Sequence, residues 1–158
     1  MNKTVIAFDE STKSTGYAIF KNSELIDYGV IEQNSKNVLE RVNNIINEIN
    51  ILIEKYKPND IALENIQITL SAPTAKSLMG LQFLIELLCF QKNIKCTTIR
   101  PTHWRKVLGL SNSSKLNRKE KKEATITYVK EKYKINEDID DICDAICIGE
   151  CYIKEEAK

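Results

Sequence analysis

Acidic residues close two short apolar runs of this chain and interrupt a third apolar segment near its C-terminus. Asp9 and Glu64 end the first two runs, and Asp141 and Asp144 lie in the third. An unpaired carboxylate is costly to bury, so a compensating group is expected near each one. Clustered carboxylates raise one another's pKa unless cations neutralise them, and all-oxygen ligand sets suit Mg²⁺ or Mn²⁺. The four acids are therefore candidate ligands for two divalent ions, which could clamp the attacking and leaving oxygens during phosphodiester hydrolysis.

The position of Asp144 is the most informative of the four. Residues three apart share one face of a helix, so Asp141 and Asp144 point the same way. That face continues into Cys147, Ile148 and Cys151, so Asp144 is in line with residues expected in the core. An ordinary amphipathic helix places its acids opposite the apolar stripe. The pattern indicates that this carboxylate is needed inside the protein.

Each acid also has an ordinary structural interpretation. Asp9 could cap a turn, Glu64 could pair with a lysine, and Asp140 and Asp141 could begin a helix, where acids interact favourably with the helix dipole. Taken singly, these interpretations are at least as strong as a metal site. Four acids at element ends, beside a basic segment, together favour the metal site.

The basic segment emerges when the net charge of +1 is divided along the chain. Residues 100–134 carry 11 basic and 3 acidic side chains, a local charge of +8. Residues 135–158 carry 2 basic and 8 acidic side chains, a local charge of −6. A solvated charged helix would explain the first part equally well, but the asymmetry suggests a surface for a polyanion beside a cation site.

The hydrophobic pattern predicts the elements that must position the acids. We expect strands over 4–8, 16–20, 24–31, 60–64 and 96–100, helices over 35–56, 71–91, 115–133 and 139–153, and an irregular, mobile loop over 104–116. Short turns make the first three strands antiparallel, and a strand that follows a long helix joins in parallel through a right-handed crossover. The expected fold is α/β, a single domain over 1–158. Its mixed five-stranded sheet has three antiparallel strands, then two parallel ones, with helices on both faces, and brings Asp9 close to Glu64.

Composition narrows the class of protein. The hydrophobic and charged fractions, 42% and 28%, are those of a soluble globular domain, and no apolar run approaches the roughly 20 residues of a membrane span. The N-terminus leads directly into the first strand, so no targeting peptide is expected. The five cysteines form no CxxC pair, which favours reduced cysteines used as small core residues over disulfides or a zinc site, and a cytoplasmic location.

Three acidic motifs in one order resemble a known family. The blocks Asp9-x-Ser11-x-x-x-Thr15-Gly16, Leu63-Glu64 and Asp141-x-x-Asp144-Ala145 look like those of the RuvC-type Holliday junction resolvases. The first block alone is weak, since sugar kinases begin with similar hairpins. The likeness spans nearly the whole chain. The segment 104–109, with its lysine-rich continuation, looks especially like small resolvases of the phage branch.

The resemblance implies an RNase H-like fold and a Mg²⁺-dependent nuclease that cuts two strands of a four-way DNA junction as a homodimer. By this resemblance Asp9, Glu64, Asp141 and Asp144 are the catalytic metal ligands. Asp140 is a rival to Asp141, because it also shares the face of Asp144 at a spacing of four. No membrane and no small-molecule cofactor is implied.

The family also has functional lysines after the fifth strand and in the basic stretch. The candidate DNA-binding residues are Arg105, Lys106, Lys115, Arg118, Lys119, Lys121 and Lys122. One departure concerns residues 65–68, which contain no aromatic side chain, whereas bacterial members carry an aromatic wedge there. We expect Trp104 to serve in packing, and His103 to be a structural or phosphate contact outside the catalytic set.

Other functions remain open on these residues. A less selective branched-DNA or RNA–DNA hybrid nuclease of the same fold is the main alternative, and a non-catalytic junction-binding module is another. An actin-like phosphotransferase would need a longer chain with two lobes and a glycine-rich phosphate loop, but the five glycines are scattered singly.

Overall fold

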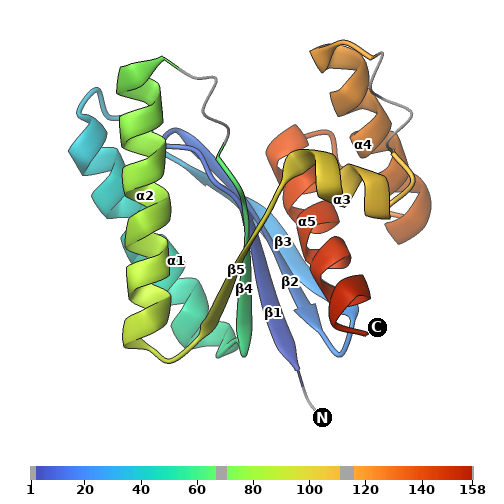
Figure 1. Ribbon diagram of the computed structural model, residues 1–158, viewed down its shortest axis with the longest axis horizontal. Helices are drawn as coiled ribbons and strands as arrows, with labels where there is room; N and C mark the ends of the chain where they lie inside the picture. Colours follow the sequence, from blue (N-terminus) through green and yellow to red (C-terminus); the bar gives the residue numbers. More distant parts are fainter. Residues whose placement is uncertain (1–2, 67–70, 111–115, 158) are drawn as a thin grey trace.

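The computed structural model describes residues 3–66, 71–110 and 116–157 (Figure 1). Its elements, in chain order, are β1 (Thr4–Asp9), β2 (Ser14–Lys21), β3 (Glu24–Glu32), α1 (Val38–Tyr56), β4 (Asp60–Glu64), α2 (Ala72–Gln91), β5 (Lys95–Ile99), α3 (Pro101–Val107), α4 (Arg118–Tyr133) and α5 (Asp140–Glu156). Within the described ranges, no helix combines the length and the apolar character needed to cross a membrane.

The five strands form one sheet in the order β3-β2-β1-β4-β5. β1, β2 and β3 pair antiparallel, whereas β4 joins β1 and β5 joins β4 in parallel, which confirms the predicted mixed sheet. The β2–β3 turn is tight because Asn22 and Ser23 both adopt positive φ, at 52° and 69°. Two successive residues of this kind give the twist that a two-residue hairpin favours.

Helices cover both faces of the sheet, as the pattern predicts (Figure 1). Alternate residues of β1 serve the two sides: Val5 and Ala7 pack in the cluster that contains α5, and Ile6 and Phe8 pack in the cluster that contains α1 and α2. β1 therefore lies between two apolar layers, which is why it reads as a continuous apolar run.

Two helices begin three residues later than expected. α1 starts after Asn37, whose side chain accepts a hydrogen bond from the backbone N–H of Leu39 at 2.9 Å. α4 starts after Asn117, which forms a reciprocal capping box with Glu120. Asparagine side chains satisfy the free N–H groups of a first helical turn, so these caps set the helix starts more precisely than the apolar pattern does.

The expected irregular loop over 104–116 is wrong in its first part. Residues up to Val107 belong to α3, with Pro101 in the first turn, where its missing N–H is no loss. Trp104 and Leu108, four residues apart, are buried in the core cluster of α5, and this burial favours a helical turn over a loop. Residues 111–115 of the expected loop lie outside the described residues.

The cysteines confirm the expectation of small core residues. Four of them, Cys89, Cys143, Cys147 and Cys151, are fully buried, and the other, Cys96, is partly buried. Three recur every fourth residue along one side of α5.

Candidate active site

Asp9 and Glu64 come together because β1 and β4 run in parallel. Phe8 pairs with Leu63, so the next residue of each strand, the acid, lies at the same carboxyl end of the sheet. This confirms the predicted juxtaposition of the two strands. Side chains at the ends of neighbouring parallel strands share one edge, where ligands commonly bind in α/β folds.

Gly16 determines how closely α5 approaches this edge. It pairs with Asp9 across β1 and β2, and a Cβ added to it would stand 2.0 Å from the backbone oxygen of Asp141. Real atoms cannot approach so closely, so only glycine allows the first turn of α5 to rest on β2 here. The Ser14 hydroxyl also donates a hydrogen bond to Asp141 Oδ2. These contacts place the start of α5 beside Asp9.

The charge of each of the other three acids acts on Asp9. Burial raises the pKa of Asp9 well above its usual range, and the neighbouring charges of Glu64, Asp144 and Asp141 raise it further. Burial also raises the pKa of Asp144 to about 7, although the Arg105 guanidinium opposes the rise. A protein that kept these carboxylates for stability alone would gain nothing from such crowding.

The donor set fits a divalent cation. Asp144 Oδ1 is buried and has no hydrogen-bond partner, while Asp144 Oδ2 lies 3.6 Å from Arg105 Nη2. One arginine does not balance four carboxylates, and an unpartnered buried oxygen is expensive. Carboxylate oxygens at one edge, with one lacking a partner, are the ligands that Mg²⁺ or Mn²⁺ prefers.

Trp104 connects α3 to this cluster. It is fully buried, which confirms its packing role, and its indole N–H donates a hydrogen bond to Glu64 Oε1 at 2.8 Å. The Arg105 guanidinium stacks over the same indole ring at 4.0 Å. Burial raises the pKa of Glu64, and the Trp104 hydrogen bond and the Arg105 charge lower it. The sequence alone did not indicate this positioning role.

Glu10 is a further acid that the sequence reasoning missed. Its carboxylate accepts hydrogen bonds from Gln82 Nε2 at 2.7 Å and from the Glu64 backbone N–H at 3.3 Å. Gln82 Nε2 also donates to the Glu64 backbone oxygen at 2.9 Å, so this network ties β1, β4 and α2 together. Burial raises the pKa of Glu10 to about 8. The alternation of strand side chains could have revealed it, because Glu10 continues the face of Ile6 and Phe8, which is the face covered by α1 and α2.

The structure separates Asp140 from Asp141. Asp140 forms an ion pair with Lys122 of α4. Asp141 accepts a hydrogen bond from the Ser14 hydroxyl, and its charge raises the pKa of Asp9. Of the two rivals, Asp141 is the one whose charge raises the pKa of Asp9, whereas both raise the pKa of Asp144.

The predicted DNA-binding residues occupy different surroundings. Arg105 is inside the acid site, and Lys106 lines a neighbouring open cavity. Arg118, Lys119, Lys121 and Lys122 follow one another in the first turns of α4, and Lys119 is the most exposed of the ion-paired side chains there, at 86%. Lys115 lies outside the described residues.

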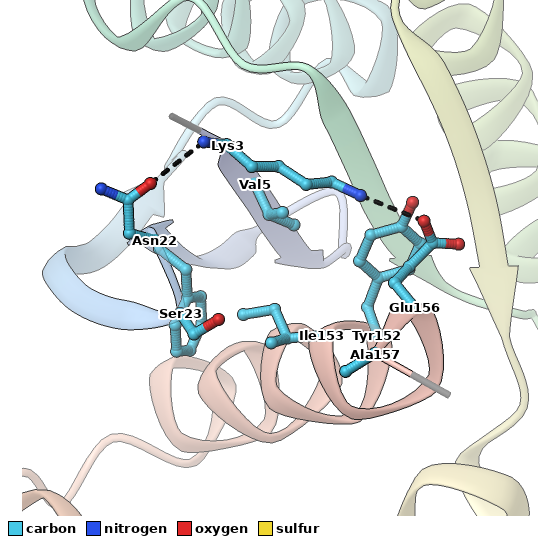
Figure 2. Close-up of a pocket in the computed structure, with 9 residues that line it drawn as sticks. Lys3, Val5, Asn22, Ser23, Tyr152, Ile153, Glu156 and Ala157 are labelled. Atoms are coloured by element: carbon cyan, nitrogen blue, oxygen red, sulfur yellow. Dashed lines mark hydrogen bonds and ion pairs between the residues drawn. The ribbon is translucent and has the colours of Figure 1, made fainter. Parts of the chain in front are cut away.

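Another cavity, of about 630 Å³, lies far from the acids (Figure 2). Lys3 spans one side of it, with its backbone N–H bonded to Asn22 and its ammonium to Glu156 (Figure 2). Lys3 directly precedes β1, and Asp9 ends it, so about 20 Å of strand separates the two places. This cavity has no part in the acid site.

A family comparison interprets this arrangement. The family model described as "Crossover junction endodeoxyribonuclease RuvC" matches residues 5–152. The chain belongs to the RuvC family. The matched range contains all four clustered acids and the basic segment of α3 and α4.

Curated relatives of the RuvC family have similar length. The crossover junction endodeoxyribonuclease RuvC of Finegoldia magna is 27% identical over 94% of this chain and 92% of its own. That of Dictyoglomus turgidum is 28% identical over 96% of this chain and 97% of its own. The likeness of residues 104–109 to phage resolvases stays a prediction.

Solved RuvC-type structures confirm the predicted RNase H-like fold. Thermus thermophilus RuvC in complex with a Holliday junction substrate superposes with a TM-score of 0.80, at 14% identity, covering 98% of this chain and 95% of that one. The Fowlpox virus resolvase, with substrate Holliday junction DNA, gives a TM-score of 0.66 at 17% identity, covering 98% and 99%.

Proposed function

We propose that this RuvC-family chain is a metal-dependent, structure-selective endonuclease that resolves four-way DNA junctions by hydrolysing one phosphodiester bond on each of two strands. The observation that carries the proposal is the cluster of Asp9, Glu64, Asp141 and Asp144 at one sheet edge, with raised pKa values and an unpartnered buried oxygen. We further propose that residues 1–158 act as one nuclease domain.

The four acids would hold two Mg²⁺ ions, with Mn²⁺ as a substitute. Bound there, such ions supply an activated water and stabilise the oxygen that leaves the phosphodiester. The protein's own residues do the positioning. Trp104 fixes one oxygen of Glu64, Gly16 and Ser14 fix Asp141, and burial excludes the bulk water that would otherwise weaken these charges.

The basic side chains of α3 and α4 support a DNA-binding surface. Lys106, Arg118, Lys119, Lys121 and Lys122, together with Lys115 from the sequence pattern, would contact phosphates. Such contacts add affinity and orient the duplex but read little sequence. Because Lys122 pairs with Asp140 of α5, this surface adjoins the acid site. Arg105 instead lies against Asp144, so we assign it to holding the site as well as to binding DNA.

An exposed apolar face on α2 supports a homodimer. Met79, Phe83, Leu87 and Phe90 are spaced by four, four and three residues, so they share one side of the helix, and they are 57%, 65%, 40% and 80% exposed. Neighbouring Gly80 has open space where a side chain would be, which permits close helix contact. A second copy of this chain is the occupant that fits, because a two-fold dimer presents one site to each of two equivalent strands.

The homodimer is tested by Phe83→Glu. A charge in the centre of the apolar face should shift the protein from dimer to monomer in sedimentation equilibrium, since a buried unpaired charge is costly. The variant should then nick single strands instead of making paired cuts. Asn47→Glu, at an exposed position of α1, is the control for added charge. A Phe83→Glu protein that remains dimeric would show that α2 does not form the interface.

The metal site is tested by Asp9→Asn in a four-way junction cleavage assay with Mg²⁺. Loss of a ligand charge should remove several kcal/mol of stabilisation and lower the rate about a hundred-fold or more. Asp138→Asn removes an exposed carboxylate outside the acid cluster, and this variant should cut normally. A folded Asp9→Asn protein that cuts at the wild-type rate would refute the proposed metal site.

The substrate class is tested by comparing cleavage of a four-way junction, a flap and an RNA–DNA hybrid. Faster cleavage of the junction supports resolution, and equal rates support the less selective nuclease. A non-catalytic junction-binding module would bind the four-way junction and cleave none of the three substrates. The cytoplasmic location expected from the cysteines stays a prediction.

A further inference from the structure

A second group of metal-binding side chains lies between α3 and α5, away from the acids. One ligand atom from each of His103, Cys151 and Glu155 lies within 4.8 Å of the other two. His103 Nε2 and Glu155 Oε1 are already 2.6 Å apart. Cys151 follows Asp144 by two helical turns, about 10 Å, so this group is separate from the acid cluster.

The fold itself brings the three residues together. Cys151 and Glu155 are four residues apart on α5, so their side chains share one face. α3 lies beside α5 (Figure 1), and its residue Trp104, next to His103 in the chain, is fully buried in the core cluster of α5. His103 is therefore held beside Cys151 and Glu155 by packing that does not depend on the histidine.

The chemistry of the donors selects the ion. A thiolate, an imidazole and a carboxylate are ligands of Zn²⁺, whereas Mg²⁺ and Ca²⁺ take oxygen ligands. Three protein ligands with a fourth position open to solvent form a common zinc arrangement. We propose that His103, Cys151 and Glu155 bind one Zn²⁺ ion that joins α3 to α5.

The observed distances are compatible with this ion. Tetrahedral Zn²⁺ with bonds of about 2.0–2.3 Å places its ligand atoms about 3.3–3.6 Å apart. The 2.6 Å His103–Glu155 contact must open by about 0.7 Å, and both side chains can move because they are 47% and 38% exposed. Cys151 is buried and forms the fixed end of the site.

The charges around the site also allow a cation. Arg100 and Lys106 line the same open cavity as His103 and Glu155, which gives the ion a route from solvent. With a thiolate and a carboxylate bound, Zn²⁺ forms a neutral complex, so these basic side chains do not repel the occupied site.

The ion would act as a clamp on the catalytic geometry. Trp104, which donates to Glu64, and Arg105, which lies against Asp144, directly follow His103 on α3. Tying α3 to α5 at His103 restrains both contacts. The site therefore offers a control of the active-site geometry by an ion of a different class from the catalytic one.

The test is Co²⁺ and Zn²⁺ titration of the reduced full chain in excess Mg²⁺. Co²⁺ bound by a thiolate gives an intense sulfur-to-cobalt charge-transfer band in the ultraviolet, which the all-oxygen acid cluster cannot produce. We expect this band to saturate at one Co²⁺ per chain and to disappear when one equivalent of Zn²⁺ is added. Zn²⁺ should also raise the melting temperature in excess Mg²⁺.

Two variants and one control decide the assignment. Cys151→Ser and His103→Gln should each abolish the band, and His103→Gln alters an exposed side chain, so it tests the site without a change to the core. Cys147→Ser removes another buried thiol from α5 and should keep the band. Absence of the band in the wild-type chain overturns the proposal, as does a band that survives in either of the two variants.

Discussion

Replacing Trp104 by Phe isolates the way in which the protein holds Glu64. The substitution keeps an aromatic ring in the core but removes the indole N–H that lies 2.8 Å from Glu64 Oε1. Burial raises the pKa of Glu64, and this hydrogen bond lowers it. A hydrogen bond to a charged group contributes about 1.5–3 kcal/mol, which corresponds to about ten-fold or more in an equilibrium constant. Without it, the pKa of Glu64 should rise further.

The assay is the rate of junction cleavage as a function of pH at subsaturating Mg²⁺. Because protonated Glu64 cannot serve as a ligand, the ascending limb of the Trp104→Phe profile should move to higher pH. At neutral pH the Mg²⁺ concentration for half-maximal rate should rise about ten-fold or more. A shift of the profile along the pH axis is the informative result, because simple loss of folded protein would lower the rate equally at every pH.

Phe20→Leu is the matched control for the change in the core. Phe20 belongs to the same core cluster as Trp104 but pairs with Val5, at the far end of β1 from Asp9. It should lower stability without moving the pH profile. A Trp104→Phe enzyme with the wild-type profile and the wild-type Mg²⁺ requirement would refute the positioning role of the indole.

Two other predictions concern the same site. Gly16→Ala should lower stability by about 1–3 kcal/mol in urea unfolding and reduce cleavage strongly, because the new methyl group would stand 2.0 Å from the Asp141 backbone oxygen; normal activity would contradict this close contact. In the metal-free protein, burial raises the pKa of Asp144 to about 7, so the folded state keeps a proton that the unfolded state releases. Asp144 should therefore contribute roughly 2–3 kcal/mol to the fall in the free energy of unfolding from pH 5 to pH 8 in EDTA, measured as the part of the fall that Asp144→Asn removes and that Mg²⁺ suppresses; an equal fall in the wild-type and Asp144→Asn proteins would argue against a buried, crowded Asp144.

The strands and the four acids could be predicted because their signals are local. Asp9 and Glu64 end apolar runs, and the helical spacing from Asp144 to Cys151 shows an acid in line with the core. Parallel pairing of β1 with β4 then follows from chain direction and the long crossover helix. These features depend on residue order alone.

The parts that failed depend on contacts between distant segments. α3 has only seven residues, too few for a periodic pattern, and its burial under α5 is what makes it a helix. The choice between Asp140 and Asp141 could not be made from helix phase, because Ser14 and Lys122 on other elements decide which way each points. Glu10 was passed over because its partners come from β4 and α2.

The close contact between Gly16 and Asp141 has a consequence for how the enzyme is made. The proposed ligands come from β1 and α5, so all the residues from Asp9 to Asp144 must leave the ribosome before they can meet. Contacts between such distant segments form late, after the local hairpin of β2 and β3. An unfinished or C-terminally truncated chain would carry the basic segment without the complete set of acids. Such a fragment would lack Asp141 and Asp144, so it could not complete the proposed metal site.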